Sequence, residues 1–326
     1  MTGVARTPDH YPTRTDRAAQ SPRRERVVWA GTRAGPLDAG ALRDYEHDGL
    51  LTVEGLLDPG EVARFQAEVD RLCADPEVLA DERAITEPGS GVLRSLFEVH
   101  AVSPVFAGLV ADPRLLDRAR QILGSEVYVH QSRINLKPGF GATGFYWHSD
   151  FETWHAEDGM PGMRALSISV SLTENTACNG PLMVMPGSHR AFVGCQGHTP
   201  EGHFRSSLRR QEIGTPSPAA LTDLARRFGI RQMTGPAGTA TIFDCNCMHG
   251  SGDNITPYPR SNLFVVYNSV DNKIGAPFRA EAGRPEFIAS RAFDPVEPPA
   301  TSAGGAAAQA GAGIPAQRDG YTVFDG

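Results

Sequence analysis

The sequence predicts a mainly β fold with flanking α-helices, and two patterns along the chain support this. From residue 126 onward, short segments alternate apolar with polar residues and end at Gly, Pro or Asn, which is typical of a β-sandwich or barrel. Before them, apolar residues recur at helical spacing. With 326 residues, 40% of them hydrophobic, the chain can bury one large core. We therefore expect a single domain over residues 29–298, with a helical flank at 41–125 and a barrel at 126–292.

Two helices of the flank are predicted from capping and periodicity. Residues 58–74 begin with an Asp-Pro pair suited to an N-cap and first turn, and their apolar stripe runs from Val62 to Leu72. Residues 113–123 repeat this design.

The barrel is predicted from six alternating segments and one interruption. The expected strands are 126–137, 144–151, 164–173, 181–186, 238–244 and 261–270. A helix with an apolar stripe begins at Ser217-Pro218. We therefore expect residues 191–235 to be an insertion that covers one mouth of the barrel.

Both ends of the chain differ in composition from the domain. Residues 1–28 are polar and rich in arginine, so we expect an arm that lies over the surface or is disordered. Its basic cluster, Arg23, Arg24 and Arg26, is interpreted as a solvated tail rather than a binding patch. Residues 299–326 form a low-complexity Ala/Gly tail, for which we expect disorder.

Composition excludes several classes of protein. A formal charge of −7 argues against a nucleic-acid partner, because phosphates need a basic surface. The chain holds no apolar run of about 18 residues and no apolar segment typical of a secretory signal. Its five cysteines are odd in number and form no CxxC pair, so we expect reduced thiols in a cytoplasmic protein.

A metal site is predicted from one HxD motif and one distant histidine. On a strand, His148 and Asp150 project from the same face. His249, which follows the strand at 238–244, is the candidate third ligand. Two histidines and one carboxylate leave three coordination positions open, as in non-haem iron(II) oxygenases. These positions can accept a bidentate 2-oxo acid and O₂.

Arg260 strengthens the iron interpretation, because its planar guanidinium can bind the far carboxylate of 2-oxoglutarate with two hydrogen bonds. An HxD pair alone arises often by chance. A zinc hydrolase with Glu152 as general base stays open from spacing alone. A halogenase is disfavoured, because Asp150 occupies the position that a halide would need.

The other histidines are expected to lie outside the metal site. His189 sits in a Pro-Gly-Ser-His turn and is interpreted as a turn residue or as support for a ligand. His155, His198 and His203 lie in loop-like sequence and are expected to be solvated. His130 is out of phase with Gln131 and should face away.

Polar stripes run along two strands near the predicted site. Gln131, Arg133 and Asn135 share one face of their strand, and alternate serines share one face of residues 164–173. From the residues alone we favour solvated stripes over stripes that line the interior. Trp154 and Phe264 could wall a small pocket. With Gln131 and an arginine, such a pocket would suit a small ring with a delocalised cation and a carboxylate.

Residues 145–161, FYWHSDFETWHAEDGMP, and the following MRALS resemble the signature of the ectoine hydroxylases. These enzymes belong to the phytanoyl-CoA dioxygenase-like superfamily of iron(II)/2-oxoglutarate oxygenases. The resemblance covers roughly residues 10–292 and includes YPTR at 11–14, VVW at 27–29, HQSRIN at 130–135, NGPL at 179–182, PGSHR at 186–190, IFD at 242–244, MHGS at 248–251, NITP at 254–257 and RPEFIASR at 284–291.

The resemblance implies a double-stranded β-helix (jelly-roll, cupin-like) with flanking helices, a homodimer, and iron ligated by His148, Asp150 and His249. The residues that would hold 2-oxoglutarate are Asn135, Tyr146, Ser169, Ser251 and Arg260. The residues that would contact the substrate are Gln131, Trp154, Phe264 and Arg284. It also implies that the polar stripes face inward.

The activity that the resemblance implies is conversion of ectoine to 5-hydroxyectoine with release of succinate and CO₂, in the synthesis of a protective compatible solute. Two alternatives remain. One is a hydroxylase of another small zwitterion such as proline, and the other is a non-catalytic barrel that binds a solute.

Overall fold

The computed structural model describes residues 8–31, 33–87, 91–140, 142–208 and 211–299. The sheets and helices given below lie within these residues. Most of the expected disordered tail, from residue 300 on, lies outside them, as do the first seven residues of the arm.

The strands form one large and two smaller sheets. They are β1 (Gln20–Pro22), β2 (Leu50–Val53), β3 (Ala84–Thr86), β4 (Leu93–Phe97), β5 (Val127–Lys137), β6 (Phe145–His148), β7 (Ala165–Ser171), β8 (Leu182–Val184), β9 (Ala191–Val193), β10 (Arg231–Gln232), β11 (Ala240–Asp244), β12 (His249–Ser251) and β13 (Arg260–Ser269). The large sheet has the order β2-β11-β7-β13-β5-β4-β3, and the four-stranded sheet has the order β10-β8-β12-β6. β1 pairs with β9. The large and four-stranded sheets together line two interior cavities. This is the expected cupin-like double-stranded β-helix.

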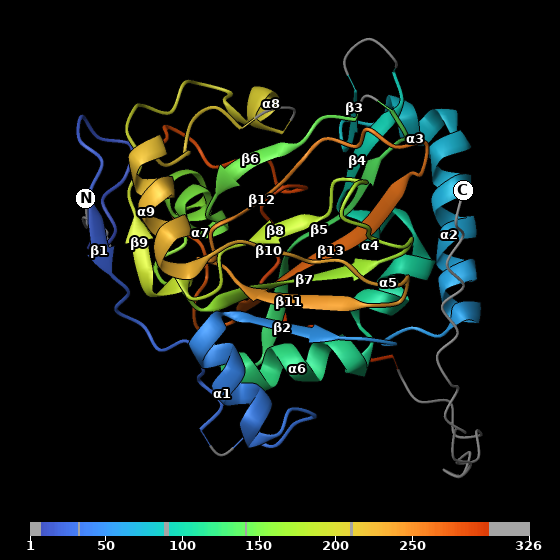
Figure 1. Cartoon of the computed structure of the whole chain (residues 1–326), viewed down its shortest axis with the longest axis horizontal. Helices are drawn as coiled ribbons and strands as arrows, with labels where there is room; N and C mark the ends of the chain where they lie inside the picture. The colour runs from blue at the N-terminus through green and yellow to red at the C-terminus, as the bar shows by residue number, and fades with distance from the viewer. Residues whose placement is uncertain (1–7, 32, 88–90, 141, 209–210, 300–326) are drawn as a thin grey trace, which may run out of the picture.

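Helices flank the sheets. They are α1 (Ala39–Asp48), α2 (Pro59–Ala74), α3 (Pro76–Ala80), α4 (Val99–Val102), α5 (Pro104–Val110), α6 (Pro113–Leu123), α7 (Asp150–Thr153), α8 (Phe204–Ser207) and α9 (Pro218–Phe228), with a π-helix η1 (Trp154–Asp158) and a 3-10 turn η2 (Ser188–Arg190). In Figure 1, α6 lies below β2 and β11, and α2 and α9 stand at opposite sides of the sheets. The predicted helices correspond to α2, α6 and α9. α2 begins with the capping box of Asp58 and Glu61.

The main core lies between the large sheet and the helices α2, α5 and α6. Ile168 and Val170 of β7 and Ile134 of β5 are buried there. The polar residues that alternate with them point the other way. Ser167, for example, donates a hydrogen bond to Asp150 at 3.2 Å. Our preference for solvated stripes is therefore wrong, and the inward orientation implied by the resemblance is correct. Alternation with a period of two shows which residues of a strand share a face, but it does not show which face points to solvent. In this sheet both faces are covered.

One strand prediction is too long, and this changes how the HxD motif is presented. β6 ends at His148, and Asp150 is the first residue of α7. Asp150 is therefore brought beside His148 by the turn from β6 into α7, and not by the alternation of side chains along a strand that the sequence predicted. The other five predicted strands correspond to β5, β7, β8, β11 and β13, with ends that differ by at most two residues.

The part of the N-terminal arm that the structure describes, from residue 8 onward, lies against the domain. β1 pairs with β9, and the Arg23 side chain is 4% exposed in an ion pair with Asp244 at 2.7 Å. The solvated interpretation is therefore wrong for Arg23, although Arg24 and Arg26 are exposed. The composition of the arm could not show that Arg23 pairs with a buried carboxylate from a distant part of the chain. None of the helices described is both long and apolar enough to cross a membrane.

Candidate iron and cosubstrate site

The HxD pair and the distant histidine converge on one point. His148 and His249 are opposite each other on the neighbouring strands β6 and β12, with ring centroids 4.3 Å apart. Each Nε2 atom lies 3.8 Å from Oδ1 of Asp150. One ligand atom from each residue lies within 4.8 Å of the others. In the described part of the chain, this is the one group of His, Cys, Asp and Glu residues so arranged.

Backbone carbonyls fix the tautomers of both histidines. Nδ1 of His148 lies 2.7 Å from the carbonyl oxygen of Tyr146, and Nδ1 of His249 lies 2.9 Å from that of Cys247. Each Nδ1–H therefore donates to a carbonyl, and each Nε2 presents its lone pair toward Asp150. The donor set of two imidazoles and one carboxylate fits a divalent iron ion.

Charge and burial favour ligand-competent protonation states. Burial lowers the pKa of His148 to about 4, with repulsion from His249 as a second cause. Burial alone would raise the pKa of Asp150, but His249, His148 and Arg133 outweigh it and lower that pKa. At neutral pH the site therefore holds a carboxylate and a neutral His148.

The ligands His148 and His249 border a cavity that holds a buried arginine. Arg260 is 1% exposed, and its Nε has no hydrogen-bond partner among the described residues. Burial lowers its pKa to about 10. A buried cation without a counter-ion is costly and is stabilised when an anion binds. The residues around this cavity are Arg133, Asn135, Phe145, His148, Leu182, His249, Gly250, Ser251, Arg260 and Phe264.

The ligands His148 and Asp150 border a second cavity. Its lining residues are Gln131, Arg133, Phe145, His148, Asp150, Thr153, Trp154, Ser207, Leu208, Gln211 and Arg284. Asp158 accepts hydrogen bonds from Nε and Nη2 of Arg284 at 2.8 and 2.5 Å, which orients the guanidinium. Gln131 donates to the carbonyl of Ile288 at 2.7 Å. This cavity is thus lined by two aromatic side chains, Phe145 and Trp154, and by several polar groups, of which Arg284 and Gln131 are held by hydrogen bonds.

The structure brings most of the predicted site residues to these cavities, with three differences. Tyr146 does not reach either cavity, because its side chain is half exposed on the outer face of β6. Ser169 lies behind the cavity and accepts a hydrogen bond from Asn262 at 3.1 Å. Phe264, predicted to touch substrate, lines the cavity of Arg260 instead.

Two residues with a direct place in the site were missed. Arg133 and Phe145 line both cavities. Arg133 also lies over the Phe264 ring, with its guanidinium carbon 5.2 Å from the ring centroid. Its position between Gln131 and Asn135 on one strand face was a usable signal. Phe145 carried no such signal, because a register shift in the pairing of β6 with β12 breaks the alternation.

Several expectations about other residues are corrected. His155 and His203 are buried rather than solvated, and His155 stacks on Phe278 with centroids 4.0 Å apart. His198 is exposed, as expected. Glu152 cannot be the general base of a zinc hydrolase, because it is 1% exposed and its carboxylate is held by Arg14.

Comparisons with known proteins agree with this geometry. A family model described as phytanoyl-CoA dioxygenase (PhyH) matches residues 45–262. The chain is 61% identical to the ectoine dioxygenase of Streptomyces anulatus over 290 residues, which cover 89% of this chain and 98% of that protein. It is 58% identical to the ectoine dioxygenase of Streptomyces coelicolor over 290 residues, 89% of this chain and 97% of the relative.

Among solved structures, the chain resembles EctD from S. alaskensis with 2-oxoglutarate and 5-hydroxyectoine. The identity is 48% and the TM-score 0.81, over 89% of this chain and 98% of that chain. The same protein with bound Fe gives 47% identity and a TM-score of 0.80, over 89% and 98% of the two chains.

Proposed function

This chain belongs to the phytanoyl-CoA dioxygenase family and, within it, to the ectoine dioxygenases, and from that premise we propose that it converts ectoine to 5-hydroxyectoine. The reaction uses Fe(II), 2-oxoglutarate and O₂ and releases succinate and CO₂. The proposal rests mainly on one observation: the candidate iron ligands border two separate cavities, one suited to the cosubstrate and one to the substrate. Ligands His148 and His249 border a cavity whose buried Arg260 has an unpaired Nε, and His148 also borders the cavity with Trp154 and Arg284.

We assign His148, Asp150 and His249 as the residues that hold iron, on the strength of their Nε2 and carboxylate geometry. When bound, Fe(II) supplies the redox chemistry that activates O₂ with 2-oxoglutarate as the electron donor. The chain contributes neutral imidazoles, a carboxylate steadied by Ser167, and shelter from water.

The cosubstrate is placed in the cavity of Arg260. The guanidinium suits the distal carboxylate, since a planar fork can donate two parallel hydrogen bonds. Asn135 and Ser251 line the same cavity and offer further polar contacts. We retain Ser169 only as support for Asn262, because its hydroxyl accepts from that amide.

The substrate is placed in the cavity of Trp154. Ectoine carries a delocalised cation in a small ring, which suits the face of an indole, and a carboxylate, which suits Arg284 or Arg133. Gln131 adds an amide beside them. The residues at 207, 208 and 211 border this cavity, so we propose that part of the 191–235 segment covers it.

We also propose that residues 29–298 form one domain, with boundaries at residues 29 and 298.

The class of reaction can be tested by supplying ¹⁸O₂ with iron(II), 2-oxoglutarate and ectoine. We expect one labelled oxygen in the hydroxylated product and one in succinate. Proline in place of ectoine is the control for the alternative hydroxylase. An unlabelled product would exclude O₂ as the source of the hydroxyl and would overturn the proposal.

We also propose a cytoplasmic homodimer. All five cysteines, each within the described residues, are free, which suits a reducing compartment. The exposed side chains of Phe140, Ile255 and Tyr258 gather on two loops joined by a hydrogen bond from Phe140 N–H to the Thr256 carbonyl at 2.8 Å. Such a patch suits contact with a second copy. A solution mass of one chain by light scattering would contradict the dimer.

Lys137 should make 2-oxoglutarate binding depend on pH. Its ammonium donates to Oγ of Ser251 at 3.0 Å and to the Gly252 carbonyl. Burial, then repulsion from Arg260 and Arg94, lowers its pKa to about 7, against attraction by Asp253 and Glu87.

Below that pKa the protonated lysine attracts a dicarboxylate, and above it the charge is lost. We therefore expect KM for 2-oxoglutarate to rise as the pH rises through about 7. Lys137→Met should flatten this dependence. Lys273→Met serves as the control, because Lys273 follows the end of β13 opposite to Arg260. An unchanged pH profile in the Lys137 variant would assign the effect to another group.

A further inference from the structure

The N-terminal arm reaches the back of the candidate site through Thr13 and Arg14. The Arg14 backbone N–H donates to the Cys195 carbonyl at 2.7 Å, and the Cys195 N–H donates to Oγ1 of Thr13 at 2.9 Å. Arg14 has φ of 51°, a left-handed conformation that is uncommon for a residue with a long side chain. Its side chain is fully buried. The surrounding contacts therefore hold this arginine in one defined place.

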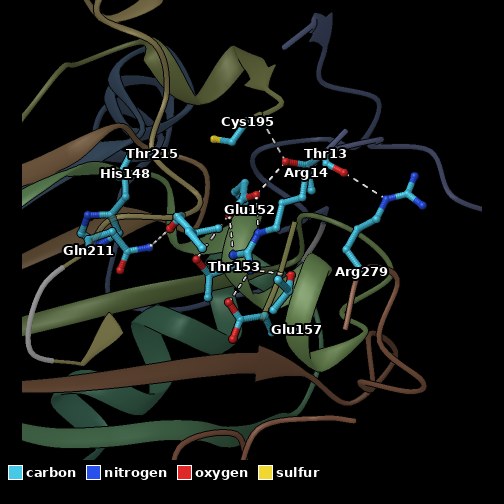
Figure 2. A network of polar contacts seen from close by, with 12 residues as sticks. Thr13, Arg14, His148, Glu152, Thr153, Glu157, Cys195, Gln211, Thr215 and Arg279 are labelled. Atoms are coloured by element: carbon cyan, nitrogen blue, oxygen red, sulfur yellow. Dashed lines mark hydrogen bonds and ion pairs between the residues drawn. The ribbon is translucent and has the colours of Figure 1, made fainter. Parts of the chain in front are cut away.

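The Arg14 guanidinium binds two buried carboxylates at once. Nε and Nη2 donate to the two oxygens of Glu152, each at 3.1 Å, and Nη1 donates to Glu157 at 2.5 Å. Thr13 adds a hydrogen bond to Glu152 at 2.6 Å, and Thr199 accepts from Nη1 at 2.9 Å. Figure 2 shows Arg14 between the two glutamates.

This ion cluster is closed to water. Glu152 and Glu157 are 1% and 2% exposed, and among the described residues Arg14 forms ion pairs with both carboxylates. Nε2 of His203 lies 4.0 Å from Glu157, but burial lowers the pKa of His203 and so disfavours its charged form at neutral pH. Arg284 also attracts Glu157, without forming an ion pair among those described. Removing one member of a buried ion group leaves an uncompensated charge, which is strongly unfavourable.

Both glutamates belong to the short segment that builds the site. Glu152 lies in α7, whose first residue is the ligand Asp150, and Glu157 lies in the π-helix that begins at Trp154. Asp158, the last residue of the π-helix, orients Arg284. A four-residue helix followed by five residues of π-helix has little stability of its own, and π-helix is often found at functional sites. The conformation of this segment must be held from outside.

We propose that Arg14 is a positioning residue, through which the N-terminal arm holds the 150–158 segment so that Asp150 faces the two histidines and Trp154 faces the substrate. The inference rests on the proposed function for the identity of the substrate. On this proposal, the N-terminal arm supports the active site through Arg14, although the arm itself does not line either cavity. The cavity of Arg260 is built from β5, β6, β8, β12 and β13 and lies outside this segment.

The test compares Arg14→Lys with two control variants on the same arm. Lysine keeps the charge but loses the fork that joins Glu152 to Glu157. Arg23→Lys is the matched control for a buried arginine, since Arg23 pairs with Asp244 and donates to the Met163 carbonyl instead. Arg17→Ala is the control for an exposed side chain.

The measurements are the Fe(II) dissociation constant of the substrate-free protein under anaerobic conditions, KM for ectoine, KM for 2-oxoglutarate, and Tm. For Arg14→Lys we expect Fe(II) affinity and ectoine KM each to worsen by about 10-fold, the scale seen when support of a metal ligand is lost. KM for 2-oxoglutarate should change by less than about 2-fold. Arg23→Lys should lower Tm without changing Fe(II) affinity, and Arg17→Ala should change none of the four.

The proposal is overturned if Arg14→Lys lowers Tm but binds Fe(II) and ectoine as the wild type does, or if both KM values worsen equally. If this variant does not fold, Glu157→Gln, which retains the Arg14–Glu152 pair, must show the same selective pattern. The Fe(II) measurement needs no substrate, so it tests Arg14 even if ectoine proves inactive with the wild-type protein.

Discussion

Asp150→Ala is expected to abolish ectoine-dependent formation of succinate. Asp150 supplies the carboxylate that lies 3.8 Å from Nε2 of both His148 and His249. Alanine leaves two neutral ligands and removes the negative charge that offsets the metal. Metal chemistry contributes several kcal/mol to such reactions, and each 1.4 kcal/mol is a factor of ten, so we expect a loss of about 1,000-fold or more.

The loss should coincide with a fall in bound iron per chain, measured after anaerobic loading and desalting. Asp223→Ala is a suitable control, because Asp223 is exposed on α9 and pairs only with Arg227 of the same helix among the ion pairs described. Wild-type turnover in Asp150→Ala would rule out Asp150 as a ligand. Lost turnover with normal iron content would give Asp150 a role other than holding the metal.

Arg260→Ala is expected to raise KM for 2-oxoglutarate by about 100-fold or more. Truncating one partner of a buried charge pair costs about 2–5 kcal/mol, which corresponds to factors of roughly 30 to several thousand in affinity. KM for ectoine should change little, because Arg260 lines one cavity and Trp154 the other.

Arg260→Lys separates charge from shape. It keeps the cation but cannot form two parallel hydrogen bonds, so its KM for 2-oxoglutarate should lie between those of the wild type and Arg260→Ala. Arg227→Ala, on the exposed surface of α9, controls for loss of an arginine. If Arg260→Ala retains the wild-type KM for 2-oxoglutarate, the distal carboxylate binds elsewhere, and Lys137 or Arg133 becomes the candidate.

Some of this site could be predicted from local spacing. His148 and Arg260 could be assigned because His148 ends β6 and Arg260 begins β13, where position along the chain determines position in the site. The spacing argument for Asp150 nevertheless rested on a strand that stops at His148. The ligand geometry is produced by a turn into α7.

Other features depend on contacts between distant parts of the chain. Arg14 and Glu152 are 138 residues apart. Composition predicted only an arm that lies over the surface or is disordered, because nothing local to Arg14 indicated its partner. His155 was assigned to a loop, yet it is buried by Phe278 and a hydrogen bond to the Met160 carbonyl at 2.8 Å. Tyr146 follows Phe145 in sequence but faces outward. Alternation could not identify the inner residue where the strand pairing shifts.

The most direct test of the function is the ratio of succinate to 5-hydroxyectoine formed by purified protein with iron(II), 2-oxoglutarate, O₂ and ectoine. Parallel reactions omit ectoine or replace it with proline. We expect one succinate for each hydroxyectoine, a mass gain of one oxygen, and little succinate in both controls. Succinate with proline but not with ectoine would retain the iron chemistry and contradict the substrate. No succinate from protein with bound iron would contradict the enzyme itself and favour a solute-binding barrel.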